Sequence, residues 1–231
     1  MLDARPNPWV LRWFNWYCRV ALRRHFHNVQ LEGELPADTT RGRLCIANHS
    51  NFWDGIVLNF LLRPLGQPLY CMIDEVQVKK HPFFRGVGGF SVDRSRPRSA
   101  LRSLEYAAGL LNAGAAVILF PQGKQEPSDE RPLVFERGVA RLLEQAQGCV
   151  ICPIALLYEF AMEQRPEIHV RIGREWPADA FIAIDGVDRL QVYLTMLLDE
   201  SRAAYLSGNS TGRKILQGQA SINQWRGWFS C

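Results

Sequence analysis

Two patterns of apolar and polar positions alternate along this chain: short apolar runs, and apolar residues that recur every three or four positions. Short, almost continuous apolar runs are typical of strands buried on both faces of a sheet. They lie at 44–47, 69–73, 90–92, 116–120, 150–157 and 168–172. Apolar residues recurring every three or four positions indicate amphipathic helices, at 54–62, 99–112, 135–147 and 187–206. This alternation predicts an α/β layered domain with a mostly parallel central sheet flanked by helices.

The N-terminal segment predicts one more helix, with an unusual surface. Asn7 and Pro8 suit the N-cap and the first helical position. Polar residues spaced by three, four and four would form one narrow stripe on a helix: Arg12, Asn15, Arg19 and Arg23. Nearly everything else in the segment is apolar, including Trp9, Trp13 and Trp16. The run is too short and too interrupted by Arg to cross a bilayer, which needs about 20 mainly apolar residues.

Two placements of this helix remain open, and they are compatible. It can lie in a membrane interface, with tryptophans at headgroup depth and arginines toward anionic lipid, or it can pack on its own domain. We expect residues 1–30 to form this amphipathic interfacial helix and residues 31–231 to form the main domain, since 231 residues suit one substantial core. The tail at 225–229, with two Trp and a Phe, is a second candidate for membrane contact or a terminal element docked on the core.

Composition narrows the function classes. Apolar residues make up 47% and charged residues 22%, which excludes wholesale disorder. Of the 27 basic residues 23 are Arg, yet the net charge of +4 is too small to argue for a nucleic-acid partner.

The six cysteines do not resemble a disulfide framework, because several fall in strand-like runs and no secretory signal is apparent. This predicts a reduced, cytoplasmic setting. Cys149 and Cys152 have the spacing of a metal pair, but the chain has no second pair and a strand would point the two thiols to opposite faces. We therefore interpret both as small core residues and predict no metal.

The strongest chemical signal is His49 followed by Asp54, between a predicted strand and a predicted helix. A loop at that junction can bring the carboxylate back beside the imidazole. The carboxylate would fix the tautomer of the ring and stabilise the imidazolium that forms when the other ring nitrogen takes a proton. The pair therefore predicts a general base, although a loop hydrogen bond or a helix cap needs the same two residues.

Three further segments follow this pair in order. They are 88–94 (Gly-Gly-Phe-Ser-Val-Asp-Arg), 119–124 (Leu-Phe-Pro-Gln-Gly-Lys) and 150–154 (Val-Ile-Cys-Pro-Ile), with a trailing segment at 132–138 after the second of them. Together with 45–55 they resemble the glycerolipid acyltransferase family, which includes the 1-acylglycerol-3-phosphate acyltransferases. The resemblance extends from about residue 44 to about residue 157.

The resemblance implies transfer of a fatty acyl group from a thioester, acyl-CoA or acyl carrier protein, to a lipid hydroxyl. His49 would be the base, Asp54 would hold it, and no cofactor or covalent acyl-enzyme would be needed. Arg94, Gln122, Gly123 and Lys124 would bind the acceptor, with the sn-2 hydroxyl of lysophosphatidic acid as the leading choice. The enzyme would act at the cytoplasmic face of a membrane as a peripheral or monotopic protein.

The 119–124 segment, the third conserved block of the family that it resembles, departs from the family's usual Pro-Glu-Gly-Thr. Gln122 replaces the Glu and Lys124 replaces the Thr, and upstream Asp74 stands about where many members carry Lys. These changes keep two alternatives open. One is the same chemistry on a non-phosphate lipid or glycolipid alcohol, and the other, from a different class, is a non-catalytic membrane lipid-binding protein.

Overall fold

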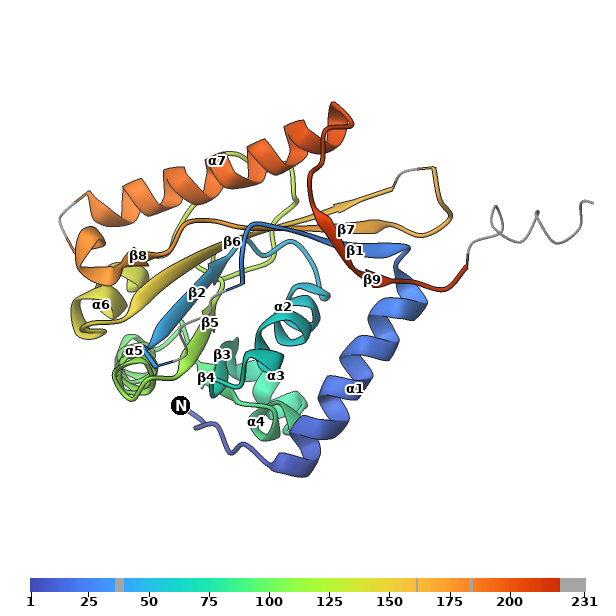
Figure 1. Cartoon of the computed structure of the whole chain (residues 1–231). Coiled ribbons are helices and arrows are strands. Elements are labelled where there is room, and N and C mark those ends of the chain that lie inside the picture. The colour runs from blue at the N-terminus through green and yellow to red at the C-terminus, as the bar shows by residue number, and fades with distance from the viewer. Residues whose placement is uncertain (36–39, 161, 183–184, 221–231) are drawn as a thin grey trace, which may run out of the picture.

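The strands of this protein assemble into a single mixed sheet in the computed structural model, which describes residues 1–35, 40–160, 162–182 and 185–220 (Figure 1). The order across the sheet is β4-β3-β5-β2-β6-β7-β1-β9, with β8 paired to β6. The strands are β1 Asn28–Glu32, β2 Arg43–Ala47, β3 Leu69–Asp74, β4 Gly89–Val92, β5 Ala116–Leu119, β6 Val150–Glu159, β7 Glu167–Ile172, β8 Trp176–Pro177 and β9 Arg213–Gln217.

The half of the sheet from β4 to β6 is parallel throughout. β7 then runs antiparallel to β6, β1 runs parallel to β7, and β9 runs antiparallel to β1. Every residue of β2 and β5 is buried, as expected for parallel strands covered on both faces. The prediction of a mostly parallel central sheet is therefore confirmed.

Helices cover both faces of the sheet. They are α1 Pro8–His25, α2 Asp54–Leu62, α3 Glu75–Lys80, α4 Phe83–Gly86, α5 Pro97–Asn112, α6 Gly138–Gln145 and α7 Gly186–Leu206, with short 3-10 turns at Arg63–Leu65 and Ala178–Phe181. Figure 1 places α5, α6 and α7 on one side and α1 to α4 on the other. Alternate side chains of β2 feed the two cores: Cys45 and Ala47 pack with α1 and α2, and Leu44 and Ile46 pack with α5, α6 and α7.

All six expected strands and the four expected helices of the main domain are present; α2 has the expected bounds and the others have shifted ends. The largest shift is at α6, which begins at Gly138 rather than at 135. The backbone N–H groups just before it are engaged elsewhere, because Phe135 donates to the Gln191 side chain and Glu136 donates to the Pro121 carbonyl. The pattern missed β1, β8, β9, α3 and α4, which are short or lie near segments without a clear period.

Helix α1 is both packed and exposed. Asn7 caps it as expected, accepting from the N–H groups of Trp9 and Val10. Its inner face buries four side chains: Phe14, Cys18, Ala21 and Leu22. Asn59 of α2 also donates to Asn15 Oδ1 at 3.0 Å. Its outer face carries Trp9, Trp13 and Trp16, exposed at 78%, 54% and 61%.

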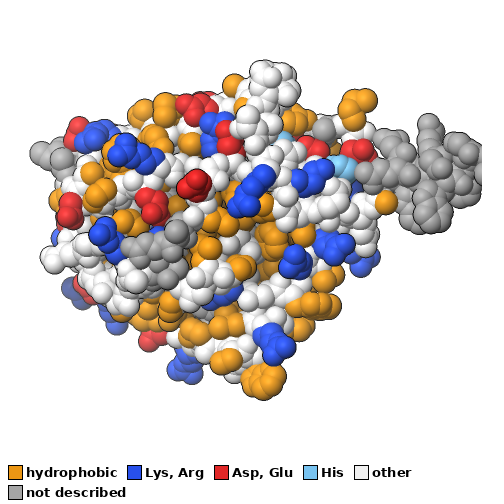
Figure 2. All heavy atoms as spheres, viewed as in Figure 1, with side chains coloured by type: hydrophobic (Ala, Val, Ile, Leu, Met, Phe, Trp, Pro, Cys, Tyr) orange, Lys and Arg blue, Asp and Glu red, His pale blue; other side chains and the backbone are white. Residues whose placement is uncertain are grey.

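Hydrophobic and basic side chains lie next to one another along the lower right of the molecule, where Figure 1 places α1 (Figure 2). One face of the helix is therefore built into the domain while the other presents tryptophan and arginine to the surroundings. Within the described ranges, no helix is long and apolar enough to cross a membrane. The tail at 225–229 lies outside the described residues.

Candidate active site

His49 lies in the loop that joins the end of β2 to α2, and Asp54 lies where that loop enters the helix. Asp54 is the first residue of α2, and its Oδ2 accepts a hydrogen bond from His49 Nδ1 at 2.8 Å. The six-residue span from one to the other is short enough that the turn into the helix alone brings the side chains together. The pairing expected from the sequence is therefore present.

Asp54 is completely buried and is surrounded by donors. Its Oδ2 accepts from the backbone N–H groups of Ser50 at 2.7 Å and Asn51 at 3.0 Å, in addition to the imidazole. Its Oδ1 accepts from the hydroxyl of Tyr158 on β6 at 2.7 Å. Four donors therefore hold this carboxylate in one orientation, at the first turn of α2.

Tyr158 is a member of this site that the sequence did not reveal. Burial and the neighbouring Asp54 carboxylate hold the pKa of its phenol well above the usual range, so the hydroxyl remains a donor. Asn48 makes a second link to β6, because its side chain donates to the Leu156 carbonyl at 2.9 Å and accepts the Leu156 N–H at 2.8 Å. β6 therefore fixes the loop that carries His49.

The imidazole of His49 is stacked on an aromatic ring and remains partly exposed. Its ring stacks on Phe120 with centroids 4.2 Å apart, and its side chain is 21% exposed. With Nδ1 bonded to Asp54, the lone pair of the neutral ring is on Nε2. No hydrogen bond to Nε2 is found among the residues that the structure describes. The arrangement leaves one basic nitrogen free to take a proton from a bound molecule.

The turn after β5 contacts the His49 loop directly, since β5 and β2 are parallel neighbours that end at the same edge. Gln122 is 3% exposed, and its Oε1 accepts the His49 backbone N–H at 2.8 Å. Its Nε2 donates to Glu126 Oε2 at 2.6 Å. Lys124 is exposed and pairs with Glu126 Oε1 at 3.1 Å. Gln122 thus contacts the backbone of His49, and the ammonium of Lys124 is turned toward the Glu126 carboxylate.

Arg94 reaches the same turn from the end of β4. Gly123 adopts a left-handed φ of +70°, and a Cβ added there would lie 2.7 Å from Arg94 Nη1. The Nη1 atom is also 3.6 Å from Glu136 Oε1, and the Arg94 side chain is 43% exposed. The structure therefore brings Arg94 against the 120–124 turn, with part of its charge open to a ligand.

Asp74, which stands upstream where many family members carry Lys, has a local structural role. Asp74 caps α3 by accepting the Val76 N–H at 2.9 Å. Lys79 pairs with Glu75 at 2.6 Å, so its ammonium is directed at that carboxylate.

The two cysteines with metal-like spacing are buried, and burial raises the pKa of the Cys149 thiol to about 11. In the described part of the chain, no three His, Cys, Asp or Glu side chains are grouped to hold a metal ion.

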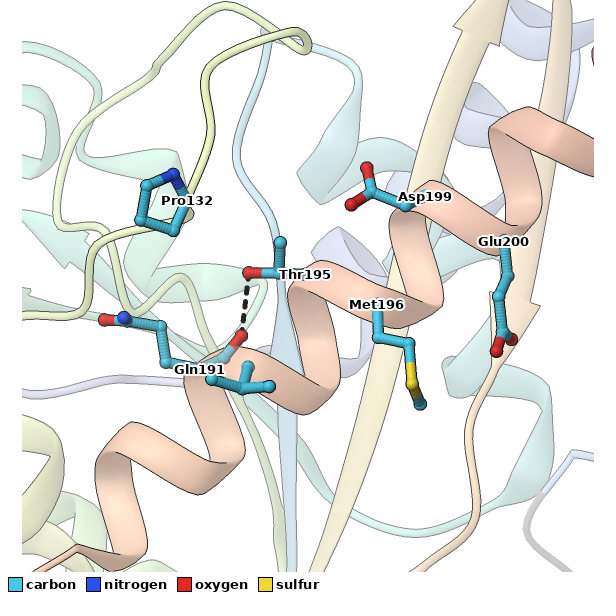
Figure 3. Close-up of a pocket in the computed structure, with 7 residues that line it drawn as sticks. Pro132, Gln191, Thr195, Met196, Asp199 and Glu200 are labelled. Carbon is cyan, nitrogen blue, oxygen red and sulfur yellow. Dashed lines mark hydrogen bonds between the residues drawn. The ribbon is translucent and has the colours of Figure 1, made fainter.

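A separate cavity of about 330 Å³ lies on the outer side of α7 (Figure 3). It is lined by Pro132 and by α7 residues including Val192, Met196 and Asp199. Thr195 Oγ1 donates to the Gln191 carbonyl within the helix at 2.8 Å. None of the candidate site residues lines this cavity, so it carries no argument about the chemistry at His49.

Comparisons with known proteins agree with this geometry. A family model described as Acyltransferase matches residues 28–157, more than half of the chain. Among solved structures, the fold is similar to that of the 1-acyl-sn-glycerophosphate (LPA) acyltransferase PlsC from Thermotoga maritima. The TM-score is 0.63 at 17% sequence identity, covering 85% of this chain and 80% of that chain. No curated protein sequence matches this one.

Proposed function

This chain belongs to the Acyltransferase family, and we propose that it moves a fatty acyl group from a thioester to the hydroxyl of a lipid acceptor. The observation that carries the proposal is the hydrogen bond between His49 Nδ1 and the buried Asp54, which leaves Nε2 without a partner among the described residues, in a loop bonded to Gln122 of the turn that also contains Gly123. The thioester would be acyl-CoA or acyl carrier protein, and no cofactor takes part.

The proposed reaction needs one base and one oriented carboxylate. His49 Nε2 takes the proton of the acceptor hydroxyl while that oxygen attacks the thioester carbonyl carbon. Asp54 stabilises the imidazolium that results, and the three other donors to Asp54 hold it in place beside the ring. When the tetrahedral intermediate breaks down, the thiolate leaves and recovers the proton from His49. A base of this kind contributes about 10²- to 10⁴-fold to a rate.

The leading acceptor is lysophosphatidic acid, acylated at its sn-2 hydroxyl. The partly exposed guanidinium of Arg94 supports a phosphate site near the base. The named activity of the Thermotoga maritima structure agrees with this choice, although the likeness is one of fold.

A non-phosphate lipid or glycolipid alcohol is the second candidate acceptor. It is favoured by the contacts of Lys124 and Gln122. The ammonium of Lys124 is paired with Glu126, which leaves one cation fewer for a phosphate, and the side-chain N–H group of Gln122 is also bonded to Glu126.

The proposed place of action is the cytoplasmic surface of a membrane, with the protein bound peripherally or monotopically. The exposed tryptophans of α1, next to arginines, support insertion into the headgroup region. A lipid acceptor would then reach the enzyme from the membrane surface. A non-catalytic lipid-binding role has the same surface but gives no reason for a base held as His49 is.

Free thiol release from acyl-CoA or acyl carrier protein, with lysophosphatidic acid present, tests the proposal. We expect acceptor-dependent release, abolished in His49→Ala and reduced about 10²- to 10⁴-fold in Asp54→Asn, which cannot stabilise the imidazolium. His81→Ala, at an exposed histidine outside the site, is the matched control and should keep full activity. Release persisting in His49→Ala would refute the base.

An acceptor panel separates the remaining candidates. Loss of activity on a phosphomonoester acceptor in Arg94→Ala, but not in Arg98→Ala at a nearby exposed arginine, would support the phosphate site. Activity on lipid alcohols unaffected by Arg94→Ala would favour the second acceptor class. Binding to liposomes without turnover on any acceptor would favour the non-catalytic role.

A further inference from the structure

Three hydrogen bonds close a ring around the backbone of His49. The His49 N–H donates to Gln122 Oε1 at 2.8 Å, and Gln122 Nε2 donates to Glu126 Oε2 at 2.6 Å. The Glu126 backbone N–H then donates to the His49 carbonyl at 2.9 Å. Both backbone polar groups of His49 are therefore bonded to the segment that follows β5, while Asp54 and Phe120 hold its ring.

The ring of three hydrogen bonds depends on the amide side chain at position 122. An amide has one accepting end and one donating end, and here each end has a specific partner. A carboxylate at 122 could still accept from His49, but it could not donate to Glu126. Two carboxylates at this separation repel each other unless they share a proton. The identities of residues 122 and 126 are therefore linked.

Glu126 is well placed to keep this role at neutral pH. Its hydrogen bond with Gln122 and its ion pair with Lys124 lower its pKa below the usual glutamate range, so it stays an acceptor. Lys124 is exposed and balances the charge of Glu126. Gln122 and Lys124, the two residues that differ from the family's usual Pro-Glu-Gly-Thr, thus both contact the Glu126 carboxylate.

We propose that Glu126 is a positioning residue, which fixes the backbone of His49 through the side-chain amide of Gln122. The inference rests on the proposed function, in which His49 is the base. It assigns Gln122 to the support of the base rather than to contact with the acceptor.

Exchanging the two residue types tests the inference. At neutral pH, Gln122→Glu should lower kcat about 10- to 100-fold, the effect of a lost charge-assisted hydrogen bond, and change the acceptor KM little. Its activity relative to wild type at the same pH should rise toward acid pH, where the two carboxyls share one proton. The double variant Gln122→Glu/Glu126→Gln should return to within about threefold of wild type, because the carboxylate at position 122 then accepts both from the His49 N–H and from the amide at position 126.

Gln125→Glu is the matched control, since it adds the same charge at an exposed neighbouring position. It should keep wild-type kcat and an unchanged pH profile. A double variant no more active than Gln122→Glu would overturn the inference. So would a Gln122→Glu variant that loses acceptor affinity at unchanged kcat, because that result belongs to an acceptor contact.

Hydrogen exchange at the His49 backbone N–H separates this inference from the proposed function. Protection should fall in Gln122→Glu and return in the double variant, whether or not the protein transfers acyl groups. Restored protection in a protein without thioester turnover would refute the proposed function and support the ring of hydrogen bonds. Protection that is unaffected by Gln122→Glu would refute the ring even in an active enzyme.

Discussion

The hydroxyl of Tyr158 donates to Asp54 Oδ1 at 2.7 Å, whereas the imidazole of His49 is bonded to the other carboxylate oxygen, Oδ2. One oxygen of the Asp54 carboxylate thus contacts His49, and the other is bonded to Tyr158 on the neighbouring strand β6. Because β6 pairs with β2 in parallel register, the sheet itself sets the position of the carboxylate. The orientation of the His49 imidazole therefore depends on a residue far away in the sequence.

Tyr158→Phe should leave Asp54 Oδ1 buried without its donor. We expect the free energy of unfolding to fall by about 1–3 kcal/mol, as for a buried charged acceptor that loses its partner, and kcat to fall as Asp54 loses its fixed orientation. Urea unfolding and thiol release measure the two effects. Tyr17→Phe, on α1, where the ring stacks on Trp13, should change neither, and wild-type stability in Tyr158→Phe would contradict the assignment.

Gly123→Ala should separate backbone strain from contact with Arg94. Gly123 and Gly66 both have left-handed φ angles, of +70° and +83°, which cost a residue with a Cβ about 1–2 kcal/mol. A Cβ at Gly66 meets nothing within 4 Å, whereas at Gly123 it meets Arg94 Nη1. Both variants should melt earlier, but only Gly123→Ala should raise KM for a phosphate-bearing acceptor. Equal KM values in the two variants would argue against Arg94 as the phosphate contact.

The lowered pKa of Glu126 predicts a stability contribution with a definite acid limit. A carboxyl whose pKa is depressed on folding stabilises the protein above its unfolded pKa, about 4.3 for glutamate. This contribution is lost as the pH falls through the lower folded value. The difference in unfolding free energy between wild type and Glu126→Gln should therefore be constant near neutral pH and vanish in acid. Denaturant titrations between neutral pH and pH of about 3 measure it; a difference that grows on acidification would contradict the sign.

Membrane binding should depend on the outward tryptophans of α1. Replacing Trp13 and Trp16 by Ser removes exposed aromatic surface without opening the core, since both side chains are more than half exposed. We expect binding to anionic vesicles to weaken by about tenfold or more, with an unchanged melting temperature. Val192→Ser/Met196→Ser removes exposed apolar groups from α7 instead and should leave vesicle binding intact. Equal loss in both pairs would mean that α1 is not the binding surface.

The local features of this protein were readable from its sequence because neighbouring residues determine them. His49 and Asp54 are close enough in the chain for one turn to join them, and Asn7 caps α1 through the N–H groups of the helix that it begins. Which face of α1 packs on the domain was left open by the sequence. The near-continuous apolar runs indicated parallel strands, and parallel strands bring the 48–54 and 120–124 loops to one edge of the sheet.

Only the tertiary structure decided the rest of the site. Tyr158 contacts Asp54 because β6 lies beside β2, and Phe120 lies against the His49 ring because β5 lies on the other side. Arg94 reaches Gly123 from β4, two strands beyond β5, and Glu126 closes a ring that passes through His49. Such contacts depend on the order of strands across the sheet, which side-chain periodicity along one strand does not encode.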